Sequence, residues 1–375
     1  MTAQAPSSRK KTTMRRRLIA CLATLALVGV TTGSAVADPD NTKTGTPPVG
    51  YTDAQIWAGV GADADAELVA NAARSFNAQS PSPANYLASY DAFDPVTGAT
   101  TTITTKPGCD LIRPNGANAG MTAIKANQKS FAGPGDGVSY CIDWVRSSRA
   151  KNITGETAYD FYALTADAVT WASVGHSYAP TTLTIAQLKK VFTCEVTDWS
   201  EVGGQKGAIH VYAPSSGAAT YTFFLQVLGI TINDVAAGCG LGTTLVQQND
   251  GRELHGDPQG ITPYAVTKWA AQKNHPAGIS DVRAGTVLGH IDGDVPPTIV
   301  TTFAGKKYTI LNPAFGSGPA GRILYDVTRT NAPPELKALF QPSGFFCAHP
   351  EFLYPFGASP LGADTTAAHW CGQLS

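Results

Sequence analysis

The chain has 375 residues, which is long enough for two domains that each bury a core. It carries 27 basic and 28 acidic side chains, and no basic cluster follows residue 37. This pattern excludes recognition of nucleic acid through a basic surface, so we expect no nucleic-acid partner.

The first 37 residues have the pattern of a secretory signal peptide. Six basic side chains precede the apolar segment Leu18–Val30, and Ala35-Val36-Ala37 is a small-residue cleavage site. A membrane anchor is the alternative, but an apolar segment of about 13 residues is too short to span a bilayer. Cleavage before Asp38 would leave 21 basic against 28 acidic groups, a net charge of −7. We expect a secreted protein, free outside the cell or held at its surface.

Residues 38–50 are polar and rich in proline and glycine, which predicts a flexible N-terminal segment. Ile56–Val60 reads as a short strand. An amphipathic helix then runs to about Phe76, and its expected core face consists of Leu68, Val69, Ala72 and Phe76.

The next stretch predicts a turn, a helix and a buried strand. Arg113–Gly116 forms the turn, and Met121 and Ile124 face inward from the helix that follows. Ile142, Trp144 and Val145 indicate a strand that ends at Ser147-Ser148-Arg149. Phe161–Ala172 then reads as one or two strands.

Leu183–Gly229 combines a helix, a strand, a loop of small residues and a second helix. Thr184 is the expected N-cap of a helix with Leu188 and Phe192 on its core face. Ile209–Tyr212 predicts a short buried strand, and Tyr221–Leu228 predicts an apolar helix. A strand, loop and helix in this order present backbone N–H groups to an anion, although many α/β proteins have such loops without a ligand.

The remaining chain predicts a strand at Ile261–Tyr264 and a helix that contains Trp269. Two β-rich runs lie within Lys306–Thr330, and a helical segment includes Leu336–Phe340. His255 is a lone loop histidine, which is usually solvated rather than catalytic.

The run LTIAQLKKVFTCEVTDWSEVGG, followed by IHVYAPSSGAATYTFF, resembles the second domain of the phosphate-binding proteins of bacterial ABC importers. The resemblance extends from about Val60 to Cys371 and includes Arg113–Gly116 and Ser147–Arg149. It implies a periplasmic-binding-protein type II fold, with two α/β lobes, a hinge and a ligand cleft between them. The implied boundaries are 51–160 and 308–375 for the first lobe and 161–307 for the second lobe.

The resemblance also implies a set of ligand-binding residues. They are Gly61, Asp63, Asn115, Gly116, Ser147, Ser148, Arg149, Gly217 and Thr220. Several hydroxyl or basic positions of the family are replaced here: the replacements are Ala62, Ala64, Asp65, Ala117, Asn118, Ala218 and Tyr221. Ala219 replaces a glycine that lets the backbone come close to the ligand. Each lost donor to a charged ligand costs about 1.5–3 kcal/mol. Ser215 and Ser216 could replace the lost hydroxyls if the loop is shifted by one or two residues.

Three functions follow from this reading. The first is binding of phosphate or a related oxyanion for ABC-type uptake by hinge closure, with a membrane permease as partner. The second is binding of another small solute or a surface polymer, with phosphate binding lost and Trp144, Trp171, Tyr221 and Tyr264 as cleft walls. The third is a secreted phosphatase or hydrolase, but no nucleophile motif or metal-spaced histidine set appears. We therefore expect a monomeric, non-enzymatic binding protein without a cofactor.

Six cysteines remain after removal of the leader, and an even number in an exported protein predicts disulfides. A metal site is the alternative, but no CxxC or Cys/His cluster supports it. Pairing neighbours in sequence keeps each bridge within one predicted lobe. The expected pairs are Cys109–Cys141, Cys194–Cys239 and Cys347–Cys371.

Overall fold

The computed structural model describes Met1 and residues 45–94, 99–126, 129–130, 139–214, 218–239, 245–362 and 369–375. The predicted signal peptide and most of the segment 38–50 lie outside these ranges.

Three neighbouring strands in the sheet of the first lobe are parallel. Strand β1 (Ile56–Gly61) lies between β2 (Tyr86–Ser89) and β7 (Trp144–Ser147). Successive side chains of a strand point to opposite faces, so Trp57 and its neighbours Ile56 and Ala58 enter different clusters.

Helices cover both faces of this sheet. Helices α1 (Ala66–Asn77) and α8 (Pro334–Phe340) pack on the face of Trp57, and α2 (Ala117–Lys125) packs on the other face. The predicted core faces of α1 and α2 are confirmed. Their buried residues include Leu68, Val69, Ala72 and Phe76 of α1 and Met121 and Ile124 of α2.

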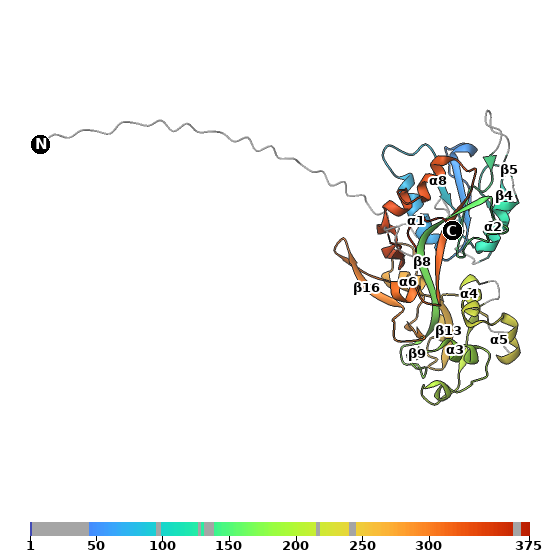
Figure 1. The fold of residues 1–375 in the computed structure, drawn as a ribbon, viewed down its shortest axis with the longest axis vertical. Coiled ribbons are helices and arrows are strands. Elements are labelled where there is room, and N and C mark those ends of the chain that lie inside the picture. Colours follow the sequence, from blue (N-terminus) through green and yellow to red (C-terminus); the bar gives the residue numbers. More distant parts are fainter. Residues whose placement is uncertain are drawn as a thin grey trace. The chain divides into compact units, whose positions relative to one another are not determined.

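The long strand β8 (Tyr159–Val174) connects the two lobes (Figure 1). Its first part pairs antiparallel with β18 (Gly321–Arg329), and its second part pairs with β13 (Gly260–Ala265) and β14 (Thr286–Leu288). Within the described chain, nine strands thereby form one sheet in the order β10-β13-β8-β18-β7-β1-β2, with β14 and β19 (Ser359–Pro360) also paired to β8.

The second lobe has its own core. Helix α3 (Ile185–Phe192) begins where Thr184 and Gln187 form a capping box, as predicted for the N-cap. Phe192 packs edge to face against Phe224 of α4 (Ala219–Leu228), with 4.9 Å between the ring centroids. Helices α5 (Ile232–Cys239) and α6 (Val266–Asn274) complete the described helices between β8 and β17.

The prediction of a buried strand at Ile209–Tyr212 is wrong in one respect. Strand β10 (His210–Val211) exists, but His210 is exposed and Val211 is only half-buried. The physical reason is its position at the end of the sheet, where β13 covers one side only.

Shorter elements complete the described chain. The strands are β3 (Thr102–Thr104), β4 (Asp110–Ile112), β5 (Lys129–Ser130), β6 (Ser139–Tyr140), β9 (Thr182–Leu183), β11 (Ala213–Pro214), β12 (Leu245–Val246), β15 (His290–Ile291), β16 (Thr298–Phe303) and β17 (Lys306–Leu311). The helical turns are α7 (Pro313–Gly316), α9 (Phe345–Ala348), η1 (Asp53–Gln55), η2 (Trp199–Val202), η3 (Arg252–Leu254), η4 (Pro350–Phe352) and η5 (Tyr354–Phe356).

Three disulfides confirm the predicted pairing. They join Cys109 to Cys141, Cys194 to Cys239 and Cys347 to Cys371, with Cα–Cα distances of 5.4, 5.0 and 5.6 Å. In the part of the chain that the structure describes, no single helix is long and apolar enough to cross a membrane, and α4 with α5 passes that test only as a pair bent by 81°.

Candidate functional site

A cleft of about 510 Å³ lies between segments of both lobes. The first lobe contributes Asn115–Ala119 and Ser148–Ala150, and the second lobe contributes the exposed side of α4 from Ala219 to Gln226. Residues Arg322, Ile323 and Tyr325 of β18 form its remaining wall. Four of the residues predicted from the sequence therefore meet here: Asn115, Gly116, Ser148 and Arg149.

The start of α2 is held against the end of β1 by backbone contacts. Gly116 is the N-cap of α2 with φ of 97°, a conformation that favours glycine. Its N–H donates to the carbonyl of Gly61 at 3.2 Å, and Gly61 also bridges Asn115. Gly61 is buried and does not line the cleft. Its carbonyl instead holds the start of α2 in place.

Both helices that border the cleft present their N-terminal ends there. The first three residues of α2 and the first residue of α4 line it, and the N-cap residues Gly116 and Ala218 have no polar side chain to cap their helices. Gln248 accepts the N–H of Thr220, the second residue of α4, at 3.2 Å. Helix N-termini carry a partial positive charge and orient N–H donors, which favours an anion in this cleft.

Arg149 is ion-paired on the first-lobe side of the cleft. Its guanidinium donates to both carboxylate oxygens of Glu156, at 3.0 and 2.7 Å, and to Asn118 Oδ1 at 2.7 Å. Lys125 also binds this carboxylate. The hydrogen bonds from Arg149 lower the pKa of Glu156 to about 2, so it stays ionised at neutral pH.

Of the two serines before Arg149, only Ser148 lines the cleft. Ser147 is fully buried, and its hydroxyl donates to the carbonyl of Arg149 at 2.8 Å, which fixes the turn.

The other predicted ligand residues do not line this cleft. Asp63 is buried, with its carboxylate 3.6 Å from Lys268, and burial raises its pKa above the usual range. Thr220 is buried, and its hydroxyl accepts a hydrogen bond from Asn249 at 3.2 Å. Gly217, Ser215 and Ser216 lie outside the described residues. The ligand roles of all these residues stay predictions.

The proposed aromatic cleft walls are wrong. Trp144, Trp171, Tyr221 and Tyr264 are at most 2% exposed and none lines the cleft. The physical reason is that these large apolar rings sit in the lobe cores, where burial stabilises them most.

Arg322 is a cleft residue that the sequence did not reveal. It donates to Asp167 Oδ2 at 3.0 and 2.7 Å and lies over the ring of Phe223 with 4.8 Å to the centroid. The pair joins β18 to β8, because Arg322 is opposite Asp167 in the strand register. A single arginine directly before the apolar run Ile323–Tyr325 was the available signal.

The described residues offer no site for a metal ion made of three or more His, Cys, Asp or Glu side chains.

A family model described as PBP superfamily domain matches residues 78–354. The chain belongs to the PBP superfamily. The predicted two-lobed α/β fold is thereby confirmed.

A solved structure shows the same fold at low sequence identity. An ABC-type phosphate transport receptor from Vibrio cholerae aligns with a TM-score of 0.53 and 15% identity, over 80% of this chain and 98% of that chain. A putative phosphate ABC transporter substrate-binding protein from Clostridium perfringens, with bound phosphate, aligns with a TM-score of 0.49 and 13% identity, over 82% and 100%. None of the curated proteins matches the sequence.

Proposed function

We propose that this PBP-superfamily member is an extracytoplasmic solute-binding protein, and that its interlobe cleft binds phosphate or a related oxyanion. The observation that carries the proposal is the position of two helix N-termini, one from each lobe, on the same cleft. A ligand that contacts both ends stabilises the closed arrangement of the lobes over the open one. The Vibrio phosphate transport receptor supports this ligand class by its fold only.

The proposal includes delivery of the solute to an ABC permease by a monomeric protein without a cofactor. Three disulfides favour an oxidising location outside the cytoplasm. The signal peptide predicted for residues 1–37 would direct export, with cleavage before Asp38.

Calorimetric titration of the oxidised mature protein with phosphate tests the ligand, after unfolding and refolding to remove carried-over solute. We expect saturable binding that Ser148→Ala weakens by about tenfold, because a hydroxyl donor to a charged ligand is lost. Ser200→Ala is the matched control, since Ser200 is exposed in η2 of the second lobe. Equal affinities of the wild type and the Ser148 variant would remove Ser148 from the site, and no binding at millimolar phosphate would reject the ligand.

A second candidate is a solute with less negative charge, with phosphate binding lost. It is favoured by the ion pairs of both cleft arginines, since Arg149 is neutralised by Glu156 and Arg322 by Asp167. A phosphate titration without heat, followed by binding of a neutral or zwitterionic solute that Ser148→Ala weakens, supports this candidate over the first.

A further inference from the structure

A separate cavity of about 140 Å³ lies on the other side of β18. Ile323 and Tyr325 border the cleft, whereas Leu324 between them borders this cavity. Alternate residues of a strand face opposite sides, so the two spaces are separated by the strand itself. The cavity is therefore not part of the oxyanion site proposed above.

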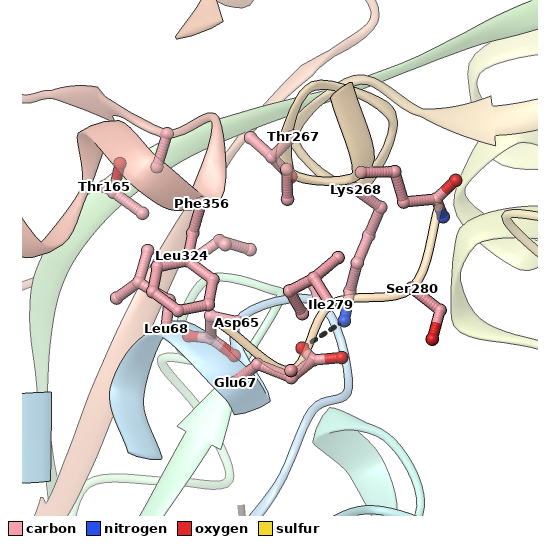
Figure 2. A pocket seen from close by; sticks show the side chains of 15 residues that line it. Asp65, Glu67, Leu68, Thr165, Thr267, Lys268, Ile279, Ser280, Leu324 and Phe356 are labelled. Carbon is pink, nitrogen blue, oxygen red and sulfur yellow. Dashed lines mark hydrogen bonds and ion pairs between the residues drawn. The ribbon is translucent and has the colours of Figure 1, made fainter. Parts of the chain in front are cut away.

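The walls of this cavity are apolar at one end and ionic at the other. Figure 2 shows Asp65 beside Leu68, Leu324 and Phe356, and Lys268 reaching from α6 toward Glu67. Asp65 precedes α1 as its N-cap residue. The volume is comparable to that of cavities of about 150 Å³ that accept a ligand of six heavy atoms.

The carboxylate of Asp65 lacks a donor from any other described residue. Its side chain is 0% exposed, and neither oxygen accepts a hydrogen bond from another described residue. The nearest cation is Arg146, whose Nε lies 4.0 Å from Oδ1. A buried ionised carboxylate that receives no hydrogen bond from another residue is costly, so this group favours a partner that donates hydrogen bonds.

The cationic side chains near Asp65 hydrogen-bond or ion-pair with other groups. Arg146 donates to the carbonyls of Ala62 and Tyr90, at 3.0 and 2.7 Å, and to Ser89 Oγ at 2.7 Å. The ammonium of Lys268 binds Glu67 and lies 3.6 Å from Asp63. Arg322 also acts on Asp65 over a longer distance, but it is paired with Asp167.

The charges around Asp65 leave an excess of carboxylates. Arg146 and Lys268 face four acidic groups, namely Asp63, Asp65, Glu67 and Asp326, and the pair of Arg322 with Asp167 adds no net charge. Burial raises the pKa of Asp65 to about 7 and that of Asp326 well above its usual range. Above neutral pH the cavity therefore carries a negative charge that a cation would neutralise.

We propose that this cavity is a binding site for a small organic cation, an alkylammonium group of a few heavy atoms, with Asp65 as its hydrogen-bond acceptor. The ammonium end donates hydrogen bonds to the carboxylate of Asp65. The alkyl end contacts Leu68, Leu324 and Phe356, which line the cavity and are each at most 7% exposed.

The test is calorimetric titration of the oxidised mature protein with n-propylammonium chloride at pH 8, at constant ionic strength. We expect saturable binding that weakens at least about tenfold in Asp65→Asn, because a hydrogen bond to a charged group is lost. Ala64→Leu fills the cavity from its partly exposed rim without changing its charge, and should also reduce the affinity at least about tenfold. Asp294→Asn, at an exposed carboxylate, should leave the affinity unchanged.

Two further readouts separate this site from general charge effects. 1-Propanol has the size of the probe without its charge, and should bind at least about tenfold more weakly. Lowering the pH to about 5.5 protonates Asp65 and should weaken n-propylammonium binding at least about tenfold. Equal binding by the wild type and Asp65→Asn, equal binding by wild type and Ala64→Leu, or no saturable binding at millimolar probe would each overturn the proposal. Phosphate titration of the same variants reports on the cleft independently.

Discussion

Arg149 donates hydrogen bonds to both carboxylate oxygens of Glu156, so the arginine predicted to bind the ligand is already paired within its own lobe. The charge of Glu156 and the charge of a bound oxyanion compete for the same guanidinium. The negative charge of Glu156 therefore weakens anion binding on the first-lobe side of the cleft.

Replacing Glu156 with glutamine should therefore strengthen phosphate binding. The variant keeps an oxygen acceptor for Arg149 but removes the negative charge, so more of the positive field reaches the cleft. We expect an increase in affinity of about fivefold, measured by calorimetry at low ionic strength. Glu195→Gln, at an exposed carboxylate of the second lobe, is the control. An unchanged or lower affinity in the Glu156 variant would show that Arg149 does not reach the ligand.

The same ion pair predicts a pH dependence of stability. The pKa of Glu156 is lowered to about 2 in the folded protein, chiefly by hydrogen bonds from Arg149, from an ordinary value of 4.5. A depressed carboxyl pKa contributes stability above its unfolded value, and this contribution disappears as the pH falls toward about 2. The wild type should lose about 3 kcal/mol more than Glu156→Gln in free energy of unfolding between pH 6 and pH 2. Parallel urea-unfolding curves over this range would contradict the prediction.

The sequence predicted the helices of both lobes well because these elements are locally encoded. The apolar faces of α1 and α2 follow helical spacing, and the N-cap Thr184 marks the start of α3. The position of β10 at the sheet edge depends on strand order, which periodicity does not contain.

The site was harder to predict, because its charges are set by partners from distant or irregular segments. Asp167 and Arg322 are 155 residues apart in sequence and meet only through the pairing of β8 with β18. Glu156 belongs to a loop, where no periodic pattern indicates which way a side chain points. The family resemblance supplied Asn115, Gly116, Ser148 and Arg149, which the structure brings together at the cleft.

The disulfide between Cys194 and Cys239 should contribute strongly to the stability of the second lobe. It closes a segment with a sequence separation of 45 and joins the end of α3 to the end of α5. Replacing both cysteines with serine should lower the free energy of unfolding by about 3–4 kcal/mol, chiefly through the unfolded chain. Denaturant unfolding without reductant measures this loss, and the Cys347→Ser/Cys371→Ser variant shows whether the effect depends on the lobe. A loss below about 1 kcal/mol would indicate that packing of α3 and α5 suffices.

Asp65 should have the opposite effect on stability to Glu156. Burial raises its pKa to about 7 in the folded protein, against an ordinary value of 3.8. The folded state therefore holds a proton that the unfolded state releases, and stability is lost as the pH rises from about 4 through about 7. Asp65→Asn avoids this loss, so we expect the variant to exceed the wild type by roughly 2–4 kcal/mol at pH 8 and to match it near pH 4. Urea unfolding at both pH values, with Asp294→Asn as the exposed control, measures the difference. A variant that is less stable than the wild type at pH 8 would mean that Arg146 stabilises the Asp65 carboxylate more than burial destabilises it.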